Sequence, residues 1–304
     1  MSSRYPEPIN PTRTSIGWIG IGVMGHAMAG RLIAAGYTLS IYARTPSKVA
    51  ALLSLGATLA ASPADLAASS DVVFTMIGHP SDVQQIILNT LLPSLTPNTV
   101  VIDHTSSHPD LAKRIYNSAL EKHCYSVDAP VSGGDVGARD GKLAIFAGGD
   151  YDVVRWLTPL FDELGQANYV GGAGKGQSCK IANQIVVGGN LVGLSEGLVF
   201  AEKAGLDKER FVEAARGGAA GSMAMELFGK RMIERDFRPG GFAEYMVKDL
   251  GMGVDVADEG EAVVVLPGAA LSKQLFAGMV ANGDGKFGTQ GVITVIERIN
   301  GMGG

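Results

Sequence analysis

Cysteine is nearly absent from this sequence, with Cys124 and Cys179 the two among 304 residues. Two cysteines do not make a disulfide framework, so the composition indicates a reducing compartment. Charged residues make up 18% of the chain and the formal net charge is −5. Because the chain has neither a basic stripe nor aromatic residues interleaved with one, we expect no binding to nucleic acid.

Membrane and targeting signals are also missing. No apolar stretch is as long as a membrane span without a charge or a Gly or Pro break. The N-terminal residues MSSRYPEPINPTRTS have no apolar core and lack the Arg-rich, acid-poor pattern of a transit peptide. We therefore expect a soluble, cytoplasmic protein without membrane contact, in which residues 1–14 form a flexible arm.

A metal site is not predicted either. His104 and His108 are four residues apart, but the loop-like segment HTSSHPD and Pro109 argue against two ligands on one helix. No cluster of cysteine, histidine and carboxylate residues accompanies them, as a metal centre would require.

Glycine, in contrast, is abundant, with 42 residues and no collagen period. This is typical of a protein whose backbone approaches ligands closely. Hydrophobic residues make up 46% of the chain. Together with its length, this content suits two domains with a large buried core.

The pattern along the chain changes near residue 175. Before it, β-rich runs alternate with helical patterns, which predicts βαβ units around a parallel sheet. The runs are IGWIGIG, TLSIYA, DVVFTMI, TVVID, CYSVDAP and LAIFAGG. After it, the pattern is helical over 177–203, 207–217, 242–260 and 268–281. AVVVLP at 262–267 fits either a short strand or a helix end.

We therefore predict an α/β protein with two domains after the arm. A Rossmann-type doubly wound domain is expected over 15–175. An all-α domain is expected over 176–304, with a long interdomain helix at its start.

The first βαβ unit carries the G-x-G-x-x-G spacing at Gly20, Gly22 and Gly25. Gly20 permits a tight turn, Gly22 lets the backbone approach a pyrophosphate, and Gly25 allows close helix packing. Val23 and Met24 open the helix, whose N–H groups and dipole attract phosphate. A turn without a ligand is the alternative, but the strand before and the helix after it favour a dinucleotide site.

The end of the second strand indicates which dinucleotide binds. No Asp or Glu lies between Tyr37 and Lys48, where NAD sites usually carry an acidic residue for the ribose. Arg44, Thr45 and Ser47 stand there instead, and a guanidinium with hydroxyls and a second cation suits a 2′-phosphate. The alternative is a solvated turn. The pattern favours NADP(H), with NAD still possible.

The segment DAPVSGG follows another strand. Ser132, Gly133 and Gly134 would present a hydroxyl and two N–H groups at the carboxyl end of the sheet, where open α/β folds bind ligands. Such donors suit a carboxylate, although a plain turn is an equal alternative from this segment alone.

The segment GKGQSCKIANQ raises a question about a lysine near the start of an apolar helix. Lys180, Asn183 and Gln184 share one helical face, which Val187 and Leu191 continue. A lysine in a cleft between domains would have a lowered pKa and could exchange a proton near neutral pH. A lysine whose charged end reaches solvent is the alternative.

Four segments together resemble the β-hydroxyacid dehydrogenase family, and they occur in the family's order over most of residues 15–300. They are GWIGIGVMG, DAPVSGG, GKGQSCKIANQ and VKDLGMGVDVA. The family includes 3-hydroxyisobutyrate dehydrogenases, tartronate semialdehyde reductases and glyoxylate/succinic semialdehyde reductases. The whole chain is most similar to the plant 3-hydroxyisobutyrate dehydrogenase-like group.

The resemblance implies roles for single residues. Lys180 matches the family's general acid, and Ser132 with its two glycines matches the carboxylate-binding motif. Asn183 or Gln184 matches a substrate-positioning amide. Lys248, in VKDL, matches a lysine that closes on cofactor and substrate. Further cofactor contacts match Gly20, Gly22, Val23, Met24, Arg44, Thr45, Lys48, Met76, Ile77 and Thr105.

The activity implied is hydride transfer between NADP(H) and a small carboxylate-bearing aldehyde or hydroxyacid: glyoxylate, or succinic, tartronate or methylmalonate semialdehyde. The family also implies a homodimer or homotetramer formed through the second domain. An imine or larger-carbonyl reductase, a decarboxylating 6-phosphogluconate-type enzyme and a non-catalytic NADP-binding protein are the alternatives. Retention of both Ser132 and Lys180 argues against the first and last of these.

Overall fold

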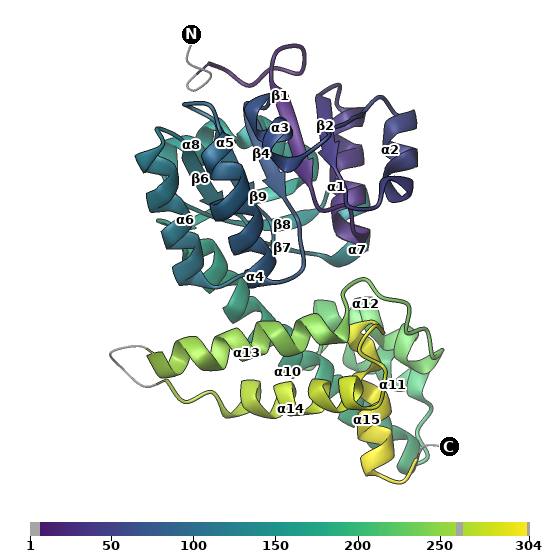
Figure 1. The fold of residues 1–304 in the computed structure, drawn as a ribbon. Helices are drawn as coiled ribbons and strands as arrows, with labels where there is room; N and C mark the ends of the chain where they lie inside the picture. The colour runs from purple at the N-terminus through teal and green to yellow at the C-terminus, as the bar shows by residue number, and fades with distance from the viewer. Residues whose placement is uncertain (1–6, 260–263, 303–304) are drawn as a thin grey trace. The chain divides into compact units, whose positions relative to one another are not determined.

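The computed structural model describes residues 7–259 and 264–302 (Figure 1). The chain divides into two compact units, Met1–Lys180 and Ile181–Gly304. The division falls inside helix α10 (Lys175–Lys203) rather than at its start, where the domain boundary was expected.

The first unit is built on a mostly parallel sheet, which confirms the predicted Rossmann-type α/β fold. Its strand order is β3-β2-β1-β4-β5-β6-β8-β7, and β9 pairs with β8. The pairs from β3 to β6 are parallel, whereas β8 runs antiparallel to β6 and β7. The strands are β1 (Ser15–Ile19), β2 (Thr38–Tyr42), β3 (Thr58–Leu59), β4 (Val72–Thr75), β5 (Val100–Asp103), β6 (Tyr125–Asp128), β7 (Val131–Ser132), β8 (Leu143–Gly148) and β9 (Gly165–Gly171).

Alternating residues of the central strands belong to separate hydrophobic cores. Val72 and Phe74 of β4 lie in one core, and Val73 lies in the other. Because side chains alternate across a strand, the two cores cover opposite faces of the sheet, as a doubly wound fold requires. The α-helices of this unit are α1 (Val23–Ala34), α2 (Ala50–Ser54), α3 (Pro63–Ala68), α4 (Pro80–Val83), α5 (Leu92–Ser94), α6 (Pro109–Glu121), α7 (Gly134–Asp140), α8 (Tyr151–Trp156) and α9 (Thr158–Leu164). A 3-10 helix (Pro46–Val49) precedes α2, and a π-helix (Gln84–Leu91) joins α4 to α5.

Part of the expected N-terminal arm is described. Asn10 and Thr14 close a turn, because the Asn10 N–H donates to the Thr14 hydroxyl at 2.9 Å. Trp156 donates its indole N–H to the Glu7 carbonyl at 2.7 Å. Residues 7–14 are therefore attached to the first unit, and the rest of the arm lies outside the described residues.

The regular elements among the described residues of the second unit are all helices, apart from one isolated β-bridge between Phe242 and Gly288. Its core includes Leu191 and Leu198 of α10, packed with Leu250 and Phe276. Helix α10 is long and apolar enough to suit a membrane span by composition alone, but these leucines lie in the protein's own core. The other helices are α11 (Lys208–Ala215), α12 (Met223–Ile233), α13 (Ala243–Glu259), α14 (Pro267–Ala281) and α15 (Val292–Ile299).

The segment AVVVLP at 262–267 was expected to be either a short strand or a helix end, and most of its described residues are neither. Residues 264–266 are neither strand nor helix, and Pro267 begins α14. Residues 262–263 lie outside the described residues.

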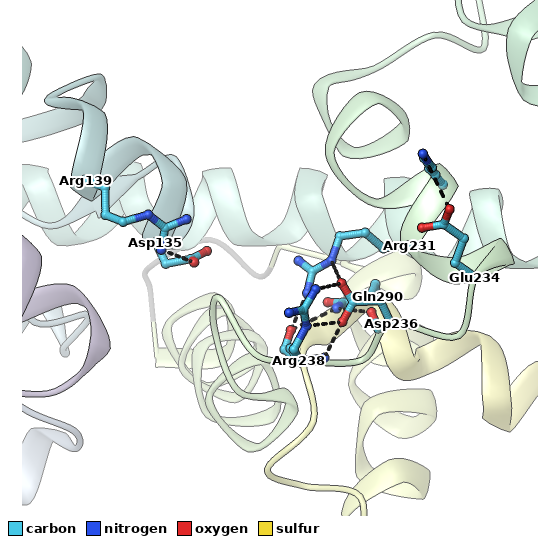
Figure 2. Close-up of polar contacts among 8 residues, drawn as sticks. Asp135, Arg139, Arg231, Glu234, Asp236, Arg238 and Gln290 are labelled. Atoms are coloured by element: carbon cyan, nitrogen blue, oxygen red, sulfur yellow. Dashed lines mark hydrogen bonds and ion pairs between the residues drawn. The ribbon is translucent and has the colours of Figure 1, made fainter.

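The loop between α12 and α13 is closed by ion pairs. Figure 2 shows Asp236 bound by Arg231 and Arg238, with Nε–carboxylate distances of 3.1 and 2.8 Å. These bonds, those of Arg238 first, lower the pKa of Asp236 well below its usual range. Gln290 donates its side-chain amide to the Asp236 carbonyl at 2.9 Å. The loop is thus joined to the 3-10 turn (Thr289–Gly291) that directly precedes the last helix.

Candidate active site

The glycine loop lies directly after β1. Gly20 has φ +99°, a conformation that L side chains rarely adopt, and a Cβ there would meet the Met76 carbonyl. A Cβ on Gly25 would meet the Gly20 carbonyl, whereas one on Gly22 would meet nothing within 4 Å. The loop is therefore tight at its first and third glycines and open at its second, as phosphate binding requires.

Helix α1 presents its N-terminus to this loop. It begins at Val23, and in the described part of the chain no side chain caps it. Its first turn also holds no acidic residue. Its N–H groups and positive dipole end can therefore receive a pyrophosphate.

The residues predicted to read the 2′-phosphate lie at the same edge of the sheet. Ile19 of β1 pairs with Tyr42 of β2, so Gly20 and Arg44 both follow neighbouring parallel strands at their carboxyl ends. Arg44 is exposed, as are Thr45, Ser47 and Lys48 in the turn that follows. This cationic turn is available to a charged ligand.

The next two strands end in a connected network. Thr75 donates its hydroxyl to Asp103 at 2.8 Å, and Asp103 also accepts the Thr105 N–H at 3.0 Å. The Thr105 hydroxyl accepts the Ile77 N–H at 2.9 Å. Thr105 is buried, and its hydroxyl holds the loop of Met76 and Ile77 through this hydrogen bond.

Lys180 is brought to the carboxylate motif. It lies in the second turn of α10, and its Nζ donates to the Val131 carbonyl at 2.8 Å. Val131 directly precedes Ser132, and Gly133, with φ +132°, leads into α7. The first unit therefore places the predicted proton donor beside the predicted carboxylate site.

The residues that hold α10 at this place were missed in the sequence. Asp128 is buried, and its carboxylate oxygens accept the N–H groups of Gly174 and Gln177, each at 2.8 Å. Burial raises the pKa of Asp128 to about 7, although both N–H bonds oppose this. The available signal was a helix that starts without a capping residue, in GKGQ.

The second unit carries a separate polar chain. Asn183 donates its side-chain amide to Gln184 at 3.0 Å, and Gln184 donates to Asp249 at 2.8 Å. Lys248 lies 3.3 Å from the same carboxylate, and its Nζ lies over the Tyr245 ring. Asn183, Gln184 and Lys248 were predicted from the sequence, whereas Asp249, which is buried, was not.

The surroundings of two histidines, His104 and His79, do not indicate a metal-binding role. His104 is buried, its Nδ1 lies 2.5 Å from the Ala129 carbonyl, and burial lowers its pKa to about 4. Its ring stacks on Phe74. His79, in the loop before α4, is exposed. Among the described residues, no three His, Cys, Asp or Glu side chains form a group able to hold a metal ion.

Two family models cover most of the chain. The NAD binding domain of 6-phosphogluconate dehydrogenase matches residues 15–174. The NAD-binding domain of NADP-dependent 3-hydroxyisobutyrate dehydrogenase matches residues 174–296. The chain belongs to the β-hydroxyacid dehydrogenase family. The resemblance predicted from its motifs is thus confirmed.

Individual relatives agree with this assignment. The chain is 55% identical to probable 3-hydroxyisobutyrate dehydrogenase-like 3, mitochondrial, of Arabidopsis thaliana, over 99% of this chain and 93% of that one. It is 37% identical to 2-hydroxy-3-oxopropionate reductase of Escherichia coli, over 93% and 97% of the two chains. The structure of Mycobacterium tuberculosis 3-hydroxyisobutyrate dehydrogenase with L-serine superposes with TM-score 0.84, 26% identity, and coverage of 93% and 99%.

The expected cytoplasmic location is wrong. Three Arabidopsis relatives, 55%, 54% and 48% identical to this chain, bear the word mitochondrial in their names. The two free cysteines indicate only a reducing environment, so they could not distinguish the cytoplasm from an organelle.

Proposed function

We propose that this chain is an NADP-dependent oxidoreductase that transfers a hydride between the nicotinamide and a small acid semialdehyde or β-hydroxyacid, with Lys180 as general acid and base. The family relation supports NAD(P)-dependent hydroxyacid dehydrogenase activity in general. The observation that carries the finer proposal is the 2.8 Å bond from Lys180 Nζ to the Val131 carbonyl, directly beside Ser132.

Each step of the reduction has a residue suited to it. The Ser132 hydroxyl and the N–H groups of Gly133 and Gly134 would bind the substrate carboxylate and orient its carbonyl carbon. The bound dinucleotide supplies the hydride. Lys180 would donate a proton from Nζ to the carbonyl oxygen as the hydride arrives at carbon, which gives the hydroxyacid. Solvent would then return a proton to the amine.

The contacts of Asn183 and Gln184 suggest which of the two amides binds the substrate. The Gln184 amide is bound to Asp249, and its oxygen accepts from Asn183. Gln184 is thereby committed to holding Asn183, which would contact the substrate. Asn183→Ala should therefore raise the KM for the acid more than Gln184→Ala does.

NADP preference depends on Arg44 in this proposal. Arg44→Ala should raise the KM for NADPH about tenfold or more, because a charge-assisted bond to the 2′-phosphate is lost. The KM for NADH should stay unchanged. Equal effects on both cofactors would contradict a role for Arg44 in 2′-phosphate recognition.

A spectrophotometric panel at 340 nm tests the activity itself. NADPH and NADH are each offered with glyoxylate and with succinic, tartronate and methylmalonate semialdehydes. Turnover of at least one acid, faster with NADPH, is expected. Tight NADPH binding without turnover of any acid would overturn the proposal, and cyclic imines and bulkier ketones would then be offered to the same protein.

The proposal extends to a homodimer through the outer face of α10. Val186 and Phe200 of this helix are 62% and 71% exposed, and Gly189 and Gly193 lie on the same face between them. An exposed apolar stripe of this kind is typical of an interface. Sedimentation should give a dimer or tetramer for the wild type and a monomer for Phe200→Glu. A monomeric wild type would contradict it.

A further inference from the structure

The start of α10 is held by a carboxylate from a distant part of the chain. Asp128 ends β6, and its two oxygens accept the N–H groups of Gly174 and Gln177, each at 2.8 Å. The first N–H groups of a helix have no partner within the helix. Asp128 therefore performs the role that a capping side chain usually performs locally.

Gln177 joins the same helical turn to the cofactor side of the sheet. Its side chain is fully buried. Its oxygen accepts the Ser107 N–H and its amide donates to the Thr105 carbonyl, both at 2.8 Å. Thr105 in turn accepts the Ile77 N–H. One helical turn is thus attached both to β6 and to the loops that follow β4 and β5.

Two glycines bring the helix into direct backbone contact with the sheet. A Cβ on Gly148 would lie 2.6 Å from the Gly176 nitrogen and 2.8 Å from an Asp128 oxygen. A Cβ on Gly176 would meet the carbonyls of Asp128 and Phe146. Neither residue can be larger, so the helix start cannot shift toward the sheet. The two hydrogen bonds to Asp128 oppose a shift away from it.

Lys180 lies one turn beyond Gln177, on nearly the same side of the helix. A rotation or slide of the first turn would therefore move the Lys180 backbone relative to the Val131 carbonyl that its Nζ contacts. Both attachments of the helix reach the same short segment of chain, because Asp128 and Val131 are three residues apart.

We propose that Asp128 and Gln177 are positioning residues that act through Lys180. They fix the position and rotation of the start of α10, so that the ammonium stays beside Ser132. This inference rests on the proposed function, in which Lys180 transfers a proton. A misplacement of about 1 Å in such a group can cost about a hundredfold in rate.

Asp128→Asn is the test variant because it keeps the side chain's shape. The amide can accept one of the two N–H groups but turns an NH₂ toward the other. We expect kcat to fall between about tenfold and a hundredfold, while the Kd for NADPH stays within about twofold of the wild type. Asp207→Asn is the matched control. Asp207 caps α11 through the Arg210 N–H at 2.8 Å, and this variant should leave kcat unchanged.

A double-mutant cycle separates positioning from general damage. In a Lys180→Ala background, Asp128→Asn should change the residual rate by less than about twofold, because the group it positions is gone. An equal loss in both backgrounds, or a wild-type kcat in the single variant, would overturn the inference. Gln177→Met takes the place of Asp128→Asn if circular dichroism shows that the latter does not fold.

A second readout does not depend on turnover. Acetic anhydride labelling followed by peptide mass spectrometry reports how fast Lys180 reacts relative to exposed Lys175 on the same helix. The ratio should rise at least threefold in Asp128→Asn, and an unchanged ratio would contradict the inference. If the wild type turned over no acid while the ratio rose, the proposed function would fail and the positioning would stand.

Discussion

Glycines at the glycine loop and at the start of α10 in the first unit differ from several helical glycines of the second unit. In the first unit, a Cβ on Gly25 or Gly176 would collide with backbone carbonyls. In the second, a Cβ on Gly189, Gly193 or Gly268 would meet nothing within 4 Å. Gly25 and Gly176 are therefore required by close backbone approach, at the glycine loop and at the start of α10, whereas these three glycines of the second unit are not. Gly221 of the second unit is the counterexample, because a Cβ there would meet the Arg216 carbonyl. In the second unit, side chains on different helices form hydrogen bonds with one another, as Gln184 does with Asp249.

The largest effect is expected at the glycine loop. Gly25→Ala places a methyl group against the Gly20 carbonyl and should destabilise the first unit by about 3 kcal/mol or more, since backbone must move. Gly22→Ala should leave the thermal midpoint nearly unchanged and weaken NADPH binding, because the space it fills is where the pyrophosphate would lie. Calorimetry with and without NADPH measures both. Similar destabilisation by the two substitutions would contradict the loop geometry.

An effect of intermediate size is expected on the pH dependence of stability, to which two buried groups of the first unit contribute in opposite directions. Asp128 has a pKa of about 7 when folded and 3.8 as its ordinary value, so its contribution to stability falls as pH rises between them. His104 has a pKa of about 4 when folded and 6.5 ordinarily, so its contribution falls as pH drops. The contribution of Asp128 is about 4 kcal/mol across its range and that of His104 is about 3 kcal/mol.

Replacing one of the two groups should leave the pH dependence of stability that the other causes. Relative to the wild type, Asp128→Asn should make stability rise more steeply with pH from 4 to 6.5, and His104→Phe should make it rise less steeply or fall. Urea unfolding at pH 4.5, 5.5 and 6.5 checks this. Slopes that change in the same direction in both variants would show that the two groups are not buried as described.

The smallest effect is expected in the second unit. Gly268→Ala, in the first turn of α14, meets no neighbour and gains helix propensity, so it should stabilise the protein by about 0.5 kcal/mol. Urea unfolding against the wild type measures this. A loss of stability would contradict the open surroundings of Gly268 and its difference from Gly25.

The sequence was most informative where a local pattern fixes the backbone. The glycine loop, the central strands and the helical second unit follow from glycine spacing and apolar periodicity. The short strands β3 and β7 carry too few residues to give such a signal, and β9, GQANYVG, has no apolar run.

Partners far apart in the chain were not predictable. Asp128 binds Gln177 across 49 residues, and Gln184 binds Asp249 across 65. The residues next to Asp128 and Asp249 in the sequence do not distinguish these two carboxylates from ordinary surface charges. The pairings depend on how strands and helices pack, which periodicity does not specify.

The central claim is that Lys180, held beside Ser132 by the start of α10, supplies the proton. The most direct measurement is the single-turnover rate of NADPH oxidation at 340 nm for Lys180→Ala, with Lys175→Ala as the matched lysine control on the same helix. We expect Lys180→Ala to lose about 10²- to 10⁴-fold in rate with NADPH affinity unchanged, and Lys175→Ala to match the wild type. Equal rates for the two variants would contradict the claim.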